Sequence, residues 1–208
     1  MWPATVALAA WRSMMTTISD QTRQGEMKVA TILSHGVAAM ALGKAFTGEP
    51  MPIRFWVALA VCAMLPDIDV LGFRFGIHYG DLLGHRGLTH SLAFAGTVGV
   101  TAVALLFRDL RPFSKSWLSL VSCFFVATSS HGLLDALTNG GLGVAFFAPF
   151  SNTRYFFPWT PIEVSPIGLR FFSSSSARAV ILSEIVGVWI PSGLIVTAAW
   201  ALRRTSRQ

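Results

Sequence analysis

Long apolar runs, separated by short polar segments, make up most of the chain after residue 26. Their pattern predicts five helices, at about 28–46, 53–66, 88–107, 116–138 and 179–202. An α-helix needs about 20 apolar residues to cross ~30 Å of hydrocarbon, and most of these runs approach that length. The pattern therefore predicts an all-α protein. It would be a polytopic transmembrane helical bundle of about five spans, with one long loop between spans four and five.

The composition supports lipid as the solvent of these helices. The chain is 53% hydrophobic and 12% charged, whereas a soluble domain carries roughly 25% charged residues. Its net charge of +6 comes from short basic clusters beside the apolar runs, which is where membrane topology places them. Nucleic acid is therefore not expected as a partner. Cys62 and Cys123 lie in different apolar runs without a CxxC pair, and we interpret both as small core residues.

The first 26 residues differ from the rest of the chain. They hold one weak apolar run, from Trp2 to Trp11, and then a polar stretch. No basic segment precedes that short run, so it makes a poor signal peptide. We interpret residues 1–26 as an N-terminal extension that a start at Met27 would remove, and residues 27–208 as a single membrane-embedded domain.

The distribution of basic residues gives an orientation. In a five-span bundle one side receives the first connector, the third connector and the C-terminus. These short segments hold Lys44, Arg54, Arg108, Arg111, Lys115, Arg203, Arg204 and Arg207. The sixteen Lys and Arg residues divide equally between the two sides, but the density on this side is higher. The positive-inside rule then makes this side cytoplasmic.

Histidines and aspartates gather at the opposite end of the predicted bundle. The alternating direction of the helices brings together residues from the first four spans. The candidates are His35, Asp67, Asp69, His85, His90, His131 and Asp135. His131 and Asp135 are four residues apart, so they share one helix face. Span two has only about 14 residues, roughly 21 Å as a helix, so the aspartates after it would lie in a recess below the headgroups.

Imidazole and carboxylate together are typical metal ligands. They suit zinc, and also manganese or iron, so the pattern predicts one or two divalent ions. Simpler interpretations remain open for each residue. His35 could donate one interhelical hydrogen bond, His131 with Asp135 could bridge two helices, and the two aspartates after Pro66 could be solvated helix ends. Ionisable groups at membrane depth are nevertheless costly and are usually functional or paired.

Several separated motifs resemble one known family. The chain carries His35, LPDID at 65–69, HRGLTHS at 85–91, HGLLDALT at 131–138 and PFSNTRYFFPW at 149–159. In this order they resemble the YdjM-type inner-membrane proteins, which are described as membrane-bound metal-dependent hydrolases and in part as LexA-regulated. The resemblance runs from about Met27 to the last span. It implies a bacterial inner-membrane location and a hydrolase-like metal site.

With that resemblance, the leading hypothesis is a metal-dependent hydrolase at the outer face of the inner membrane. A metal-activated water would attack an amphipathic lipid substrate, one that carries a phosphoester or another ester. Asp69 would act as ligand or general base, while Arg86 and Arg154 would bind an anionic group. Two other hypotheses stay open: a metal transporter, and a non-catalytic scaffold with a structural metal site. His78 is interpreted as an ordinary loop residue.

Overall fold

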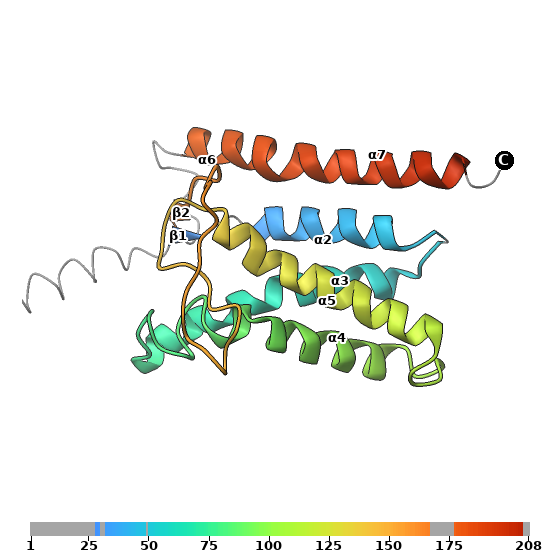
Figure 1. Ribbon diagram of the computed structural model, residues 1–208, viewed down its shortest axis with the longest axis horizontal. Coiled ribbons are helices and arrows are strands. Elements are labelled where there is room, and N and C mark those ends of the chain that lie inside the picture. The colour runs from blue at the N-terminus through green and yellow to red at the C-terminus, as the bar shows by residue number, and fades with distance from the viewer. Residues whose placement is uncertain (1–27, 30–31, 49, 167–176, 206–208) are drawn as a thin grey trace, which may run out of the picture.

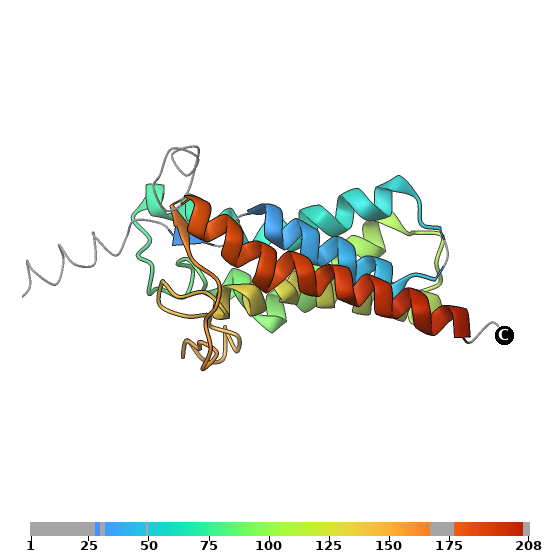
Figure 2. The ribbon, with the colours of Figure 1, turned by 90° about the horizontal axis from the view of Figure 1, so that it is seen from above.

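The computed structural model describes residues 28–29, 32–48, 50–166 and 177–205. Its long helices run side by side along the longest dimension of the molecule (Figures 1 and 2). The first two are α2 (Ile32–Phe46) and α3 (Ile53–Met64), and α3 continues into the 3-10 helix η1 (Leu65–Phe75). The 3-10 turn η2 (Leu88–His90) precedes α4 (Leu92–Leu106), and α5 (Lys115–Ala136) follows. The last segment consists of α6 (Ala177–Glu184), the π-helical turn η4 (Ile185–Trp189) and α7 (Ile190–Thr205).

Three of the described helical segments are long and apolar enough to cross a membrane. They are Ile53–Phe75, Lys115–Ala136 and Ala177–Thr205, and Leu92–Leu106 is a shorter apolar helix. The prediction of a helical protein with membrane spans is confirmed at this level, and the count of five spans stays a prediction. The described residues hold one small exception to the helical architecture, because β1 (Lys28–Val29) pairs antiparallel with β2 (Ser165–Pro166).

The core lies around α5, which packs against α2, α3 and α4. Phe55, Leu59 and Phe124 are fully buried at its centre. A Cβ on Gly43 of α2 would meet the side chain of Leu59, so this glycine allows α2 and α3 to approach closely. Cys62 and Cys123 are buried and free, as expected of core residues. Helix α7 packs on α2 at the edge of the bundle (Figure 1).

Serine caps determine where two of the helices begin. The Ser91 side chain accepts a hydrogen bond from Phe94 N at the start of α4, at 3.1 Å. The Ser114 side chain does the same for Trp117 N at the start of α5, at 3.3 Å. Such caps satisfy amide groups that have no partner within the helix. As a result His90 lies just before α4, in its own short turn, rather than inside a continuous helix from residue 88.

The second apolar segment is longer than the sequence pattern predicted. It does not end at Pro66 but continues as a 3-10 helix to Phe75, where Gly76 adopts a left-handed conformation with φ of 78°. Asp67 and Asp69 therefore lie inside a regular helical segment. Because a 3-10 helix turns by about 120° per residue, residues two apart point in different directions. The two aspartates consequently reach different partners.

Candidate metal centre

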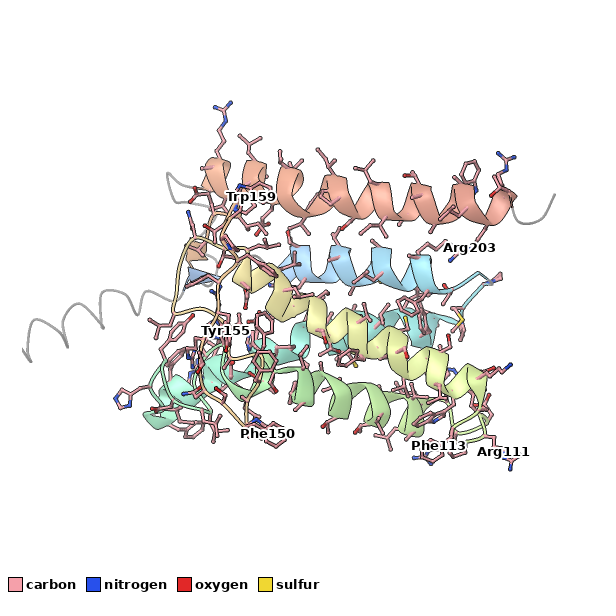
Figure 3. All side chains as sticks on the ribbon, in the orientation of Figure 1. Arg111, Phe113, Phe150, Tyr155, Trp159 and Arg203 are labelled. Atoms are coloured by element: carbon pink, nitrogen blue, oxygen red, sulfur yellow. The ribbon has the colours of Figure 1, made fainter. Side chains whose placement is uncertain are left out.

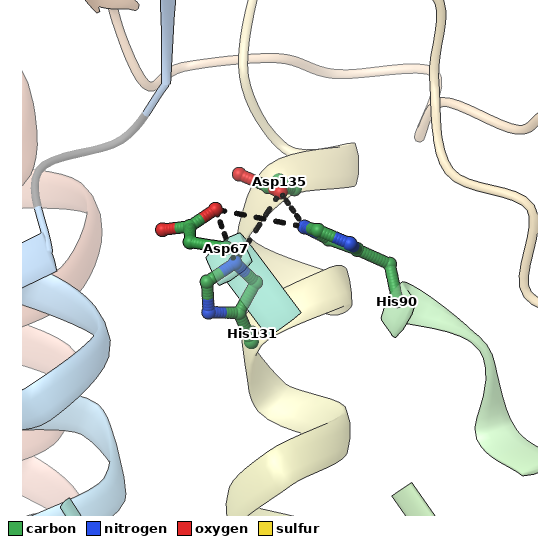
Figure 4. Close-up of side chains that lie close together, drawn as sticks. All are labelled: Asp67, His90, His131 and Asp135. Atoms are coloured by element: carbon green, nitrogen blue, oxygen red, sulfur yellow. Dashed lines mark hydrogen bonds and ion pairs between the residues drawn. The ribbon is translucent and has the colours of Figure 1, made fainter. Parts of the chain in front are cut away.

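Four side chains from three segments converge at the end of the bundle that carries the long loop after α5, which we call the loop end (Figure 1). Asp67 comes from η1, His90 from η2, and His131 and Asp135 from the last two turns of α5. One nitrogen or oxygen of each lies within 4.8 Å of the others (Figure 4). His90, His131 and Asp135 are buried, while the Asp67 side chain is 15% exposed. These buried groups could hold a metal ion.

The distances between the converging atoms fit a single small ion. His131 Nε2 lies 3.2 Å from Asp67 Oδ1, and His90 Nε2 lies 3.1 Å from Asp135 Oδ2. The two cross distances are 3.6 Å, from His131 Nε2 to Asp135 Oδ2, and 3.8 Å, from His90 Nε2 to Asp67 Oδ1. Tetrahedral ligands at about 2.0–2.1 Å from zinc are roughly 3.3 Å apart. The four donors therefore have about the spacing of a zinc ligand set.

The other nitrogen of each imidazole is already held by an acceptor. His131 Nδ1 lies 2.8 Å from the carbonyl oxygen of Ala63, and His90 Nδ1 lies 3.2 Å from Asp69 Oδ2. A carbonyl oxygen can only accept, so His131 carries a proton on Nδ1, and in the neutral ring Nε2 keeps a lone pair. The same reasoning applies to His90 beside a carboxylate. With both rings neutral, two lone pairs and two carboxylate oxygens face one another, which is an arrangement that a metal ion could bridge.

Asp69 forms an orienting layer behind His90. Its Oδ1 lies 2.7 Å from His85 Nδ1, and its Oδ2 accepts hydrogen bonds from Thr89 Oγ1 at 2.6 Å and Arg86 N at 3.2 Å. Asp69, His85 and His90 also lie close enough together to hold a metal. However, His90 directs Nδ1 at Asp69 and Nε2 at Asp135. Both oxygens of Asp69 are already hydrogen-bonded. The set that contains Asp135 is therefore the better candidate.

His35 lies directly beside the four converging side chains. It is fully buried on α2, and its ring stacks on that of His131 with centroids 3.7 Å apart. Its Nε2 is 3.9 Å from Asp135 Oδ1. Neither ring nitrogen has a hydrogen-bond partner among the described residues. Since a buried polar atom without a partner is costly, His35 is a candidate for a further nitrogen ligand at the edge of the cluster.

Arg86 is buried behind Asp135 and does not reach the surface. Its side chain is fully enclosed, and its backbone adopts a left-handed conformation with φ of 61°. The guanidinium donates to Gly140 O at 2.8 Å and to Asp135 Oδ1 at 3.2 Å. Gly141 makes room for it, because a Cβ there would lie 3.0 Å from Arg86 Nη1. Arg86 thus holds one oxygen of Asp135, and the other oxygen faces the two histidines.

Arg154 connects two loops next to the cluster. It donates to the carbonyl oxygens of His85 at 2.8 Å, Tyr79 at 2.9 Å and Asp81 at 3.1 Å. Its guanidinium also lies over the Tyr79 ring, 5.7 Å from the centroid. Burial raises the pKa of Tyr79, and arginine stays protonated in proteins, so at neutral pH a cation stacks on an uncharged phenol. Its terminal nitrogens are engaged by the protein's own backbone.

The structure also identifies polar residues that the sequence pattern did not select. Glu184 of α6 is buried and accepts a hydrogen bond from Ser34 at 2.8 Å. Ser34 in turn accepts one from Trp189 Nε1 at 2.9 Å, and it precedes His35 on α2. A single acid inside an apolar run was the available signal. His78 lies in a loop and its side chain is 88% exposed, as its interpretation as a loop residue requires.

Apolar helices and a buried histidine–aspartate cluster together define an integral membrane protein with a candidate metal centre. The family model described as "YdjM inner membrane protein" matches residues 27–206. The chain therefore belongs to the YdjM inner membrane protein family, which confirms the resemblance seen in its motifs. A relative from Escherichia coli (strain K12), "Inner membrane protein YbcI", is 39% identical over 175 residues, which is 84% of this chain and 99% of the relative. No solved structure matches the chain significantly.

Proposed function

We propose that this protein is a metal-dependent hydrolase of the bacterial inner membrane that cleaves an ester or phosphoester in an amphipathic lipid. The observation that carries the proposal is the convergence of two imidazole Nε2 atoms and two carboxylate oxygens within 4.8 Å. Asp67, His90, His131 and Asp135 would bind the ion, and His35 would supply a fifth donor. A divalent ion there would lower the pKa of a bound water to about 7 and provide a hydroxide nucleophile.

The surrounding residues would keep this ligand set in one geometry. Asp69 and the Ala63 carbonyl hold His90 and His131 by their Nδ1 atoms, so that Nε2 of each ring is directed at the ion. Arg86 balances the charge of Asp135 and holds its Oδ1. Asp69, Arg86 and Arg154 therefore act as positioning residues in this proposal, and His85 orients Asp69. The mixed nitrogen and oxygen donor set favours zinc, with manganese or iron as alternatives.

Partial exposure of Asp67 favours a catalytic site over a structural one. A structural zinc site is closed by four protein ligands, whereas a catalytic site keeps one position for water or substrate. Asp67 is the only one of the four ligands with an accessible side chain, at 15%, so substrate would enter beside it. We place this end of the bundle at the outer face, because the opposite end carries the dense basic segments.

Metal analysis of the protein purified in detergent, followed by a screen of lipid esters and phosphoesters, tests the proposal. His131→Ala should lose both bound metal and hydrolysis. His78→Ala is the matched control, because it removes an exposed imidazole outside the cluster and should retain both. A full metal content in His131→Ala would refute the metal assignment. Wild-type protein that binds metal tightly but cleaves no lipid ester or phosphoester would instead favour a structural metal site.

A further inference from the structure

An apolar groove of about 370 Å³ lies between α4, α5 and the loop that follows α5, at the loop end of the bundle. Its lining includes Leu92 of α4, Leu133 and Ala136 of α5, and Phe147, Tyr155 and Phe157 of the loop that follows α5. The groove lining contains no charged residue. Its volume falls within the range of about 300–1,000 Å³ that is typical of small-ligand sites.

Backbone hydrogen bonds hold the loop wall of the groove against the two helices. Leu92 N donates to Phe146 O at 3.0 Å, and Phe157 N donates to Ala136 O at 2.9 Å. Val144 and Tyr155 exchange two further backbone hydrogen bonds, at 2.9 and 3.0 Å. The loop is therefore attached to the start of α4 and to the end of α5. The groove is a preformed feature of the fold.

The groove lies at the same depth in the bundle as the candidate metal ligands. Leu92 follows His90 by two residues, and Leu133 follows His131 by two. Between the groove and the cluster lies Gly132, whose Cβ position is 2.9 Å from His90 O and 3.4 Å from the Phe146 ring. A larger residue at position 132 would push these walls apart. Gly132 thus lies next to both the backbone of one candidate ligand, His90, and an aromatic ring of the groove lining, Phe146.

The surroundings of the groove indicate an acyl chain as its occupant. Leu133, Phe147 and Phe157 are 42%, 53% and 41% exposed, and exposed apolar residues continue along the same two helices at Val100 and Leu118. In a membrane, such surfaces contact lipid chains, and aromatic residues gather where chains meet headgroups. Figure 3 shows Tyr155 at the loop end of the bundle, away from Arg111 and Arg203.

We infer that this groove binds one acyl chain of the lipid substrate and so places the scissile ester at the metal centre. That the bound lipid is the substrate rests on the proposed hydrolase function. The lipid site itself rests on the groove. A chain in this position would enter sideways from the bilayer, and the polar headgroup would lie toward the loops and the accessible side of Asp67.

Photocrosslinking with a phospholipid that carries a diazirine on its acyl chain tests the groove. The full chain is reconstituted in lipid nanodiscs, irradiated, and the adducts are mapped by mass spectrometry. Adducts should concentrate on the peptides around residues 133–136 and 146–157. Leu133→Trp fills the groove and should reduce this labelling several-fold. Leu118→Trp is the matched control, since it makes the same change on the same helix at a residue of similar exposure, 47% against 42%, and it should label like the wild type.

Labelling spread evenly over α4, α5 and α7, or reduced equally by both substitutions, would overturn the lipid site. For the substrate role, Leu133→Trp should raise KM for a long-chain ester several-fold and leave a short-chain ester unaffected. An unchanged KM with groove labelling lost would overturn that role. Metal content, measured on the same samples, separates the two proposals. Groove labelling in a protein that binds no metal would support the lipid site and overturn the proposed hydrolase function. Bound metal without groove labelling would overturn the lipid site and leave the proposed hydrolase function standing.

Discussion

Replacing Asp69 with Asn is the most informative perturbation of the metal centre, because it changes charge and hydrogen bonding without changing size. The carboxylate contacts four donors: His85 Nδ1, Thr89 Oγ1, Arg86 N and His90 Nδ1. An asparagine has one oxygen in place of two, so its NH2 group must face either His85 or the group around His90. One imidazole would then lose its acceptor and its fixed orientation.

The expected cost is partial, since all the proposed ligands remain. Loss of an outer partner of a metal-bound histidine typically weakens metal binding by about 10–100-fold, which corresponds to about 1.4–2.7 kcal/mol. The dissociation constant for zinc, measured in detergent by competition with a chromophoric chelator, checks this range. Asp81→Asn is the control, because Asp81 is an exposed carboxylate outside the cluster: it accepts a hydrogen bond from His78 N at 2.8 Å and lies 3.5 Å from His78 Nδ1. This variant should bind zinc like the wild type.

Two results would refute the reasoning. Unchanged zinc affinity in Asp69→Asn would mean that the carboxylate does not orient His90. Complete loss of zinc, as deep as in His131→Ala, would make Asp69 a direct ligand, which is the role that the sequence pattern also allowed. Circular dichroism in the helical region must be the same for the variant and the wild type, so that the loss is assigned to the site rather than to unfolding.

Three further predictions concern the surrounding structure. Arg86→Met leaves Oδ1 of the buried Asp135 carboxylate without its guanidinium partner, so it should lower the free energy of unfolding by about 3–5 kcal/mol; a thermal unfolding midpoint equal to the wild type would contradict this. Arg154→Lys keeps the charge but not the three carbonyl contacts, so it should retain metal and lose most turnover, and normal turnover would remove Arg154 from the site. For orientation, Leu110→Cys should be protected from an impermeant thiol reagent added outside and Ser165→Cys should be labelled, while the opposite pattern would invert the topology.

The sequence alone was sufficient for the helical class of the fold and for the convergence of the candidate ligands at one end of the bundle. An apolar run of the length of a membrane span can satisfy its backbone hydrogen bonds within the run itself only as a helix. Once the helices alternate in direction, His35, His90 and His131 must come to the same end. That argument needs only the position of each histidine within its apolar run, and both that position and the bounds of the run are read from the sequence.

Tertiary structure decided which of these residues face one another in the candidate metal centre and which hold the others in place. The sequence pattern does not distinguish Asp67 from Asp69 as candidate ligands. The 3-10 helix that contains them directs Asp67 to His131 and Asp69 to His85. No periodicity distinguishes a 3-10 turn from the end of a helix, so this division of roles was not predictable.

Arg86 and Glu184 depend on tertiary structure for the same physical reason. A guanidinium near a helix end usually extends to the headgroups, but Arg86 is enclosed because its left-handed backbone turns the side chain toward Asp135 and the Gly140 carbonyl. Glu184 pairs with Ser34, which is 150 residues away in the chain. Contacts with distant backbone and side-chain atoms follow the path of the whole chain, and hydrophobic patterning records only which face of each helix is apolar.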